Sequence, residues 1–189
     1  MFRKPYLLFI LSLASALSAF AFISPETSIS SAHAILSDKK PAEKIKWITM
    51  EEAAQKIKSN PKKVFIDVYT DWCGWCKKMD KSTFSDAEVA AYVNKNYYAV
   101  KLDAEGKEPI TLNGHTYKYN PEYKAHELAV ALLQGQMSFP TTVYLDEKFN
   151  MLTPVPGYLD AKAFSNILKY FGDNHHKTMD WQQYEKTLK

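Results

Sequence analysis

Two cysteines, Cys73 and Cys76, lie where a strand-like segment passes into a helix-like one, and the chain contains no others. The preceding run, residues 64–69, is almost entirely apolar, which favours a central strand covered on both faces. At a helix N-terminus, unpaired backbone N–H groups and the positive end of the helix dipole stabilise a thiolate. The second cysteine, one turn further on, can close a small disulfide with the first. The spacing therefore predicts a redox-active pair.

Two other uses of this cysteine pair are open. A structural disulfide is typical of exported proteins, but a pair three positions apart closes a very small loop and restricts the unfolded chain little. A zinc site usually needs four ligands, and the spacing of the five histidines does not converge on the cysteines. We therefore expect no metal and no separate cofactor, with the Cys73–Cys76 disulfide itself as the redox centre.

The N-terminus has the pattern of a secretory signal peptide over residues 1–21. Arg3 and Lys4 form a short positive region, residues 6–17 an apolar core, and residues 19–21 a small-x-small cleavage site. A retained membrane anchor is the alternative, but serines interrupt the apolar stretch, which is shorter than the roughly 20 residues of a typical span. We expect cleavage and export, without stable membrane insertion afterwards.

The remaining chain is expected to form one domain, over residues 45–175. Residues 22–44 are rich in Ser, Ala, Lys and Pro without periodicity, which predicts a flexible leader. A C-terminal helical extension is expected over residues 176–189. Loss of the signal peptide lowers the formal charge of +3 by two, and no basic stripe remains that would indicate nucleic acid as a partner.

Strand and helix patterns alternate along the domain. Apolar runs predict strands at 47–48, 64–69, 97–102, 141–145 and 152–155. Helices are expected from about 49 to 58, from Cys73, from 85 to 93, from 120 to 133 and from 160 to 171. This order predicts an α/β domain of three layers, α/β/α, around a central mixed β-sheet.

Local signals mark several boundaries. The pairs Thr49/Glu52 and Ser85/Glu88 have the spacing of a capping box, and Asn120-Pro121-Glu122 indicates another helix start. Asn113-Gly114, between two short β-favouring runs, predicts a hairpin with a two-residue turn.

Several separate motifs resemble those of one family. Residues 65–77 look like the active-site strand and loop of thioredoxins, and the resemblance extends to residues 100–103, to Phe139-Pro140-Thr141 and to Gly157. Within that superfamily, the Trp-Cys-Gly-Trp-Cys-Lys pattern is similar to exported bacterial thioredoxin-like proteins. The resemblance covers about residues 64–171 and implies a thioredoxin fold and a periplasmic location, with secretion as the alternative.

The resemblance also implies roles for the residues that match. Cys73, exposed at the helix start, would attack a substrate disulfide as the thiolate, and Cys76 would resolve the mixed disulfide. Asp67 would be a buried carboxyl near Cys76, with a raised pKa, that accepts the proton of that thiol. Lys101 would neighbour Asp67 and moderate its pKa. On the residues alone, an edge or surface position is the alternative for Asp67, and Lys101 could equally be an exposed strand residue.

Substrate contacts are expected on both sides of the cysteines. Phe139-Pro140 looks like the family's cis-proline loop, in which the backbone of Phe139 would turn toward solvent and pair with an extended substrate segment. A trans proline at the start of a strand is the alternative. Trp72, Gly74 and Trp75 are expected to contact substrate around the thiol, while a partly buried hydrophobic patch is the other interpretation of the two tryptophans.

The chain departs from the family pattern in two places. Trp75 replaces the proline common in cytosolic thioredoxins, and the residues between the cysteines tune thiolate stability, so the direction of electron flow stays open. Residues 104–136 form an inserted segment before the cis-proline loop, longer than the minimal fold needs. This insertion either shapes a partner-binding rim or is decoration.

The sequence thus predicts an exported thiol–disulfide oxidoreductase that acts on protein disulfides and is reduced by an unidentified upstream thiol reductant. A disulfide oxidase or isomerase with the same site is one alternative. A non-catalytic thioredoxin-fold module that binds peptides is another. Substitution of Cys73 separates the last from an enzyme, since a binding module would keep its affinity and an enzyme would lose turnover.

Overall fold

The computed structural model describes residues 43–188. The expected signal peptide, and the expected leader as far as residue 42, lie outside the described residues. None of the helices between residues 43 and 188 has the length and apolar character that a membrane span requires.

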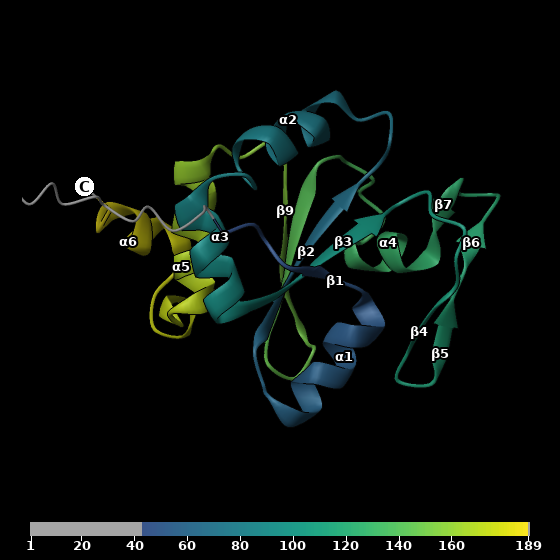
Figure 1. Ribbon diagram of the computed structural model, residues 1–189, viewed down its shortest axis with the longest axis horizontal. Coiled ribbons are helices and arrows are strands. Elements are labelled where there is room, and N and C mark those ends of the chain that lie inside the picture. The colour runs from purple at the N-terminus through teal and green to yellow at the C-terminus, as the bar shows by residue number, and fades with distance from the viewer. Residues whose placement is uncertain (1–42, 189) are drawn as a thin grey trace, which may run out of the picture. The chain divides into compact units, whose positions relative to one another are not determined.

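A five-stranded sheet forms the centre of the domain (Figure 1). In spatial order its strands are β1 (Trp47–Ile48), β3 (Tyr97–Asp103), β2 (Lys63–Tyr69), β8 (Thr141–Leu145) and β9 (Met151–Pro156). The first three strands run parallel to one another, and β8 and β9 pair antiparallel with their neighbours. The predicted mixed sheet is confirmed.

Helices cover both faces of this sheet. They are α1 (Met50–Ser59), α2 (Gly74–Ser82), α3 (Ala87–Asn96), α4 (Glu127–Leu132), α5 (Ala161–Gly172) and α6 (Trp181–Lys186), with a short 3-10 helix at His175–Lys177. One apolar cluster joins the sheet to α2, α3, α5 and α6, and a second joins it to α1 and α4. The expected α/β/α layering is therefore present.

Alternation along β2 decides which residues reach the face of the sheet that packs against α2. Phe65 packs in the cluster with α2, α3 and α5, whereas Ile66 and Val68 pack in the cluster with α1 and α4. Since successive side chains of a strand point to opposite faces, Asp67 lies on the same face as Phe65. Lys101 stands beside Asp67 in the β2–β3 register.

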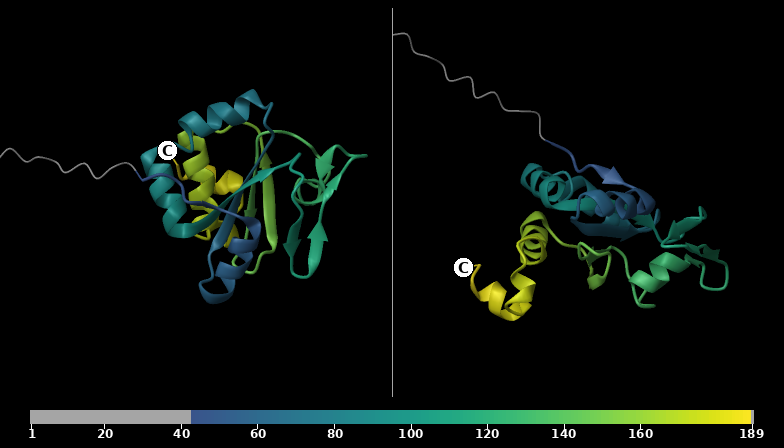
Figure 2. Two further views of the ribbon diagram at one scale, coloured as in Figure 1. Left: turned by 45° about the vertical axis from the view of Figure 1, so that its right-hand side comes forward. Right: turned by 90° about the horizontal axis from the view of Figure 1, so that it is seen from below.

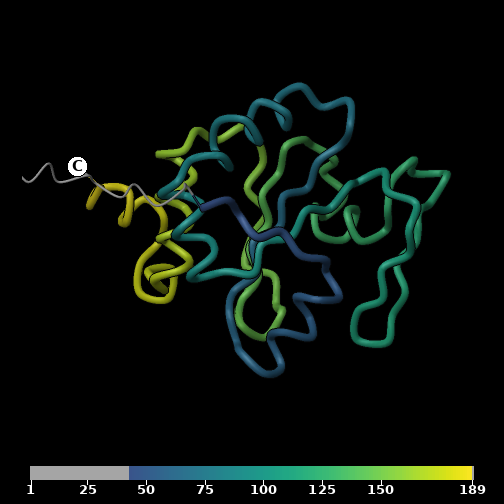
Figure 3. Tube along the Cα trace, in the orientation of Figure 1, coloured from purple at the N-terminus to yellow at the C-terminus, as the bar shows by residue number. Residues whose placement is uncertain are grey.

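The inserted segment lies on the side of the domain away from α5 and α6, as the views in Figures 1 and 2 agree. Its path from β3 to β8 can be followed in Figure 3. The predicted hairpin is confirmed as β4 (Ile110–Leu112) and β5 (His115–Tyr117). Asn113 and Gly114 have φ angles of 51° and 82°, as a two-residue hairpin turn with both central residues in the left-handed region requires.

The capping box expected at Ser85 and Glu88 is wrong. The N-cap of α3 is Asp86, whose carboxylate accepts the backbone N–H of Glu88 at 2.9 Å. Ser85 instead donates its hydroxyl to the carbonyl oxygen of Asp80 at 2.7 Å. Ser85 and Asp86 are both residue types that cap helices well. Because the Ser85 hydroxyl is bonded to α2, Asp86 is the residue that caps α3.

The helix expected to start at Asn120 is also wrong. Residues there form two short paired strands, β6 (Tyr119–Asn120) and β7 (Ala125–His126), and α4 follows with His126 as its N-cap. The Asn120 side chain accepts the backbone N–H of Glu122 at 2.8 Å. This local bond stabilises a turn at Asn120 instead of a helix start. Asn side chains bond to nearby backbone N–H groups both in turns and at helix N-termini, so the residue type alone does not distinguish the two structures.

Strand β9 forms one edge of the sheet and carries two prolines, Pro154 and Pro156. Residues of an antiparallel strand direct their backbone groups alternately toward the partner and away from it. The N–H of Gly157 donates to the carbonyl of Pro140 at 2.8 Å, toward β8. Pro154 and Pro156 therefore occupy the positions that face the open edge.

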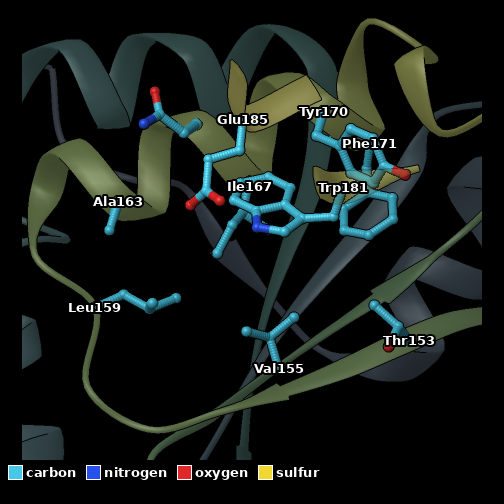
Figure 4. A pocket seen from close by; sticks show the side chains of 10 residues that line it. Thr153, Val155, Leu159, Ala163, Ile167, Tyr170, Phe171, Trp181 and Glu185 are labelled. Carbon is cyan, nitrogen blue, oxygen red and sulfur yellow. The ribbon is translucent and has the colours of Figure 1, made fainter. Parts of the chain in front are cut away.

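The C-terminal helix α6 packs against α5. Tyr184 is buried, and the Trp181 ring lies perpendicular to Tyr170 with ring centroids 5.3 Å apart. Between α5, α6 and β9 lies a mostly apolar cavity of about 440 Å³, into which Figure 4 shows Trp181 and Ile167 pointing. The predicted limits of the domain and its extension stay a prediction, although α6 shares a cluster with the core.

Trp181→Ala is expected to lower the free energy of unfolding by about 2 kcal/mol, since a half-buried indole that packs on the core is lost. Urea denaturation followed by circular dichroism measures this change. Gln182→Ala, at an exposed position of the same helix, is the matched control and should leave stability within about 0.5 kcal/mol. Equal stability of the two variants would show that the Trp181 side chain contributes nothing to the stability of the fold.

Candidate active site

The two cysteines are joined by a disulfide at the N-terminus of α2, as predicted. Their Cα atoms lie 5.3 Å apart, within the range of ordinary disulfides. Cys73 is the N-cap of α2, and its Sγ accepts the backbone N–H of Cys76 at 3.0 Å. The turn from β2 is closed by the N–H of Cys73, which donates to the carbonyl of Thr70 at 3.1 Å.

The expectation that Cys73 is exposed is wrong for this disulfide form. Only 4% of Cys73 and 3% of Cys76 is accessible, whereas Trp72 and Trp75 are 66% and 56% exposed. The Cys73 sulfur turns back to cap the helix instead of projecting into solvent. The tryptophans next to the cysteines thus present accessible surface near the disulfide. The alternative interpretation of the tryptophans, a partly buried hydrophobic patch, does not fit these exposures.

Asp67 is buried, with 1% of the residue accessible. Its Oδ2 pairs with Lys101 Nζ at 3.0 Å, and the same ammonium reaches Asp80 Oδ1 on α2 at 2.6 Å. Asp67 Oδ1 has no hydrogen-bond partner among residues 43–188. The expected pairing of Asp67 with Lys101 is present, and one carboxylate oxygen is left free to take a proton.

The environment sets the proton affinity of this carboxyl. Burial raises the pKa of Asp67 from its ordinary value of 3.8 to about 6, and Lys101 offsets only part of that rise. For Lys101, burial acts to lower the pKa, but the carboxylates of Asp67 and Asp80 outweigh it and raise the pKa above 10.5. Lys101 therefore stays charged, while Asp67 can exchange a proton near neutral pH.

Trp72, which directly precedes Cys73, packs against Phe139. The Phe139–Pro140 peptide bond is cis, as the family resemblance implies. The rings of Trp72 and Phe139 meet edge to face with centroids 5.9 Å apart. Gly74 has no heavy atom within 4 Å of the position that a Cβ would take, so the surface beside the disulfide is open there.

Trp75 has two neighbours, Tyr158 and Lys78, that the sequence did not single out. Trp75 lies 5.2 Å from the ring of Tyr158, and Lys78 Nζ lies 4.7 Å from the Trp75 ring centroid and 5.0 Å from that of Tyr158. Tyr158 follows Gly157, the residue on which part of the family resemblance rests, and this adjacency was an available signal.

Two acidic residues were also missed. Asp80 lies four positions after Cys76 on the same helix, a spacing that places both on neighbouring turns. Glu105 accepts the indole N–H of Trp72 at 3.1 Å from the start of the inserted segment. Nothing in the local sequence around Glu105 indicates this contact.

No group of three or more His, Cys, Asp or Glu side chains within residues 43–188 is arranged to hold a metal ion.

Comparison with known proteins identifies the family. A model of the thioredoxin-like domain matches residues 50–172. The thiol:disulfide interchange protein DsbD of Haemophilus influenzae strain PittEE is 32% identical over 124 residues, which cover 63% of this chain and 18% of DsbD. DsbD of Actinobacillus pleuropneumoniae is 34% identical over 112 residues, which cover 58% of this chain and 16% of DsbD. The chain thus spans less than a fifth of the length of these relatives.

Solved structures share the fold. A DsbH oxidoreductase superimposes with a TM-score of 0.53 at 20% identity, covering 71% of this chain and 90% of that one. A thioredoxin-fold protein from Helicobacter pylori gives a TM-score of 0.52 at 18% identity, covering 68% and 81% of the two chains. At such identities these likenesses establish the thioredoxin fold alone.

The family model covers most of the chain and contains β2, the disulfide and the cis-proline bond. The family and the cysteine pair together support a thiol–disulfide redox function. The chain belongs to the thioredoxin-like family.

Proposed function

We propose that this protein is an exported thiol–disulfide oxidoreductase that reduces or exchanges disulfides in protein substrates. The observation that carries the proposal is the Cys73–Cys76 disulfide at the N-terminus of α2, with the exposed tryptophans Trp72 and Trp75 next to the cysteines in the chain. The N-terminal signal pattern supports export, and the periplasm is the proposed location. The printed name of the DsbD relatives, thiol:disulfide interchange protein, is consistent with this chemistry.

In the proposed reaction the reduced protein donates two electrons. The Cys73 thiolate attacks one sulfur of the substrate disulfide, forming a mixed disulfide and releasing the other substrate sulfur as a thiolate that takes up a proton. Cys76 passes its proton to the Asp67 carboxylate and attacks the Cys73 sulfur. The second substrate thiol then leaves, and the Cys73–Cys76 disulfide forms.

A further thiol reductant must return the two electrons. A dithiol partner would attack the Cys73–Cys76 disulfide and leave as a disulfide itself, which restores both thiols. Within this protein the cycle uses the two cysteines as its redox groups, so the proposed cycle calls for no additional cofactor. An oxidase or isomerase would use the same residues, and equilibration with glutathione of defined redox ratio decides the direction.

The surface around the disulfide suits protein substrates better than small disulfides. Trp72 and Trp75 are both more than half exposed, and each is supported by a second aromatic ring. Exposed aromatic side chains of this kind are typical of protein-binding surfaces. We assign Trp72, Gly74, Trp75, Phe139 and Pro140 to substrate binding, and Asp67 with Lys101 to proton transfer.

Alkylation of the reduced protein tests the assignment of the two thiols. Cys73 is expected to react with iodoacetamide about tenfold faster than Cys76 at pH 6, because the N-terminus of α2 stabilises its thiolate. Peptide mapping by mass spectrometry measures the labelling of each cysteine. The urea-unfolded protein is the control, in which both should react alike. Equal labelling in the folded protein would remove the basis for naming Cys73 the nucleophile.

A further inference from the structure

We propose that the inserted segment, residues 104–136, fixes one wall of the substrate surface, and that Glu105 is the positioning residue through which it acts. The wall consists of Trp72 and Phe139. The inference rests on the proposed function, because it assigns to the insertion a role in selecting protein substrates at the same disulfide.

Trp72 is exposed but held at two points. Its indole Nε1 donates to Glu105 Oε1 at 3.1 Å, and its ring stands at 85° to Phe139 with centroids 5.9 Å apart. An exposed side chain with two rotatable bonds otherwise samples several rotamers, and ordering it on binding costs free energy. A bond at the polar end and a ring contact on the apolar side keep the indole in place before a substrate arrives.

The backbone around Glu105 is fixed to the sheet. The N–H of Ala104, a fully buried residue, donates to the carbonyl of Tyr69 at the end of β2 at 2.8 Å. The N–H of Glu105 donates to Asp103 Oδ1 at 2.9 Å. Glu105 is therefore presented from a defined turn beside the strand that leads into the disulfide.

The body of the insertion holds this turn from the other side. The backbone N–H of His126 donates to the carbonyl of Ala104 at 2.7 Å. Its buried ring accepts the N–H of Leu128 at Nδ1, and its Nε2 lies 3.1 Å from the carbonyl oxygen of Glu108. His126, which ends β7 and caps α4, therefore contacts the backbone at both ends of the segment 104–108.

The second aromatic pair, Trp75 and Tyr158, has no contact to the insertion among those that hold Trp75. The Trp75 ring packs against the Tyr158 ring. The Tyr158 hydroxyl lies 3.2 Å from Ser82 Oγ at the end of α2. The two aromatic pairs are therefore built from different parts of the chain, and only the Trp72 wall can be altered through Glu105. A protein segment with apolar side chains beside its cysteine is the partner that two aromatic pairs fit, whereas a small disulfide meets only the sulfur atoms.

Insulin and bis(2-hydroxyethyl) disulfide serve as the protein and small disulfides in steady-state assays with dithiothreitol as reductant, each corrected for the uncatalysed reaction. Glu105→Ala is expected to raise the KM for insulin about three- to tenfold, the equivalent of one hydrogen bond, with a smaller change in kcat. The ratio of kcat/KM for insulin to that for the small disulfide should fall accordingly. Glu105→Gln keeps an acceptor oxygen and should restore the unaltered values.

Glu108→Ala is the matched control, because it removes an exposed carboxylate from the same loop. The nitrogen–proton NMR signal of the Trp72 indole should move in Glu105→Ala and stay in place in Glu108→Ala. An unchanged insulin KM in Glu105→Ala, an equal loss with both disulfides, or a Glu105→Gln variant as poor as Glu105→Ala would overturn the inference. If the unaltered protein reduces neither disulfide, the proposed function fails, and the indole signal alone decides whether Glu105 positions Trp72.

Discussion

Cys76→Ser is expected to stop turnover and to leave Cys73 joined to its substrate protein through a mixed disulfide. The serine hydroxyl cannot attack the Cys73 sulfur, so the intermediate has no route to a Cys73–Cys76 disulfide. Incubation of the reduced variant with insulin, followed by non-reducing electrophoresis and intact-mass measurement, detects the adduct. Dithiothreitol should release it.

Cys73→Ser provides the matched control, since it also removes one thiol from the pair. This variant should show neither turnover nor an adduct, because the remaining thiol is not the one at the helix N-terminus. An adduct of equal yield from both variants would contradict the assigned order of attack. If Cys73→Ser binds substrate proteins as the unaltered chain does and neither form shows turnover, the protein is a binding module and not an enzyme.

Asp67→Asn is expected to make the fold more stable above pH 6. Because the folded-state pKa of about 6 exceeds the ordinary value of 3.8, the folded protein keeps a proton in this interval that the unfolded chain has released. The stability of the unaltered protein therefore falls as pH rises from about 4 to 6. Since each pKa unit is worth about 1.4 kcal/mol, the total loss is about 3 kcal/mol.

The asparagine variant should lack this pH dependence. Lys101 keeps Asp80 as a partner at 2.6 Å, so removal of the Asp67 charge leaves no lone ammonium. Urea denaturation of the oxidised protein between pH 4 and pH 8 makes the comparison, and Asp71→Asn, at an exposed position, is the control. The same pH slope in both variants would contradict the burial of a titrating carboxyl at Asp67.

The same substitution tests proton transfer. Asp67→Asn should slow the resolving step, because Cys76 loses its proton acceptor, while the first attack by Cys73 proceeds at nearly its normal rate. Rapid acid quenching during a single turnover with insulin would reveal accumulation of the mixed disulfide. An unchanged rate of its disappearance would count against the role of Asp67.

Local signals in the sequence predict the centre of this fold well. The apolar run of β2, the capping box at Thr49 and the hairpin at Asn113-Gly114 each involve residues close together in the chain, and each is present in the structure. The errors at Ser85 and Asn120 also have local causes, since polar residues with similar capping ability compete for the same backbone groups.

The rest of the site depends on contacts between distant segments. Trp72 and Glu105 are 33 positions apart, and their bond exists only because the insertion returns to the end of β2. The second partner of Lys101, Asp80, comes from a different element, and β3 and α2 meet only in the folded domain. The burial of Cys73 likewise follows from how its sulfur caps α2, which the spacing of the cysteines does not reveal.

The prolines of β9 have a consequence for how this protein can meet other chains. A strand that joins a sheet needs donors along the open edge, and Pro154 and Pro156 place no N–H groups there. The opposite edge of the central sheet is β1, which is only two residues long. A protein proposed to act on other proteins thereby offers them little template for pairing with its sheet edges, which limits aggregation by that route.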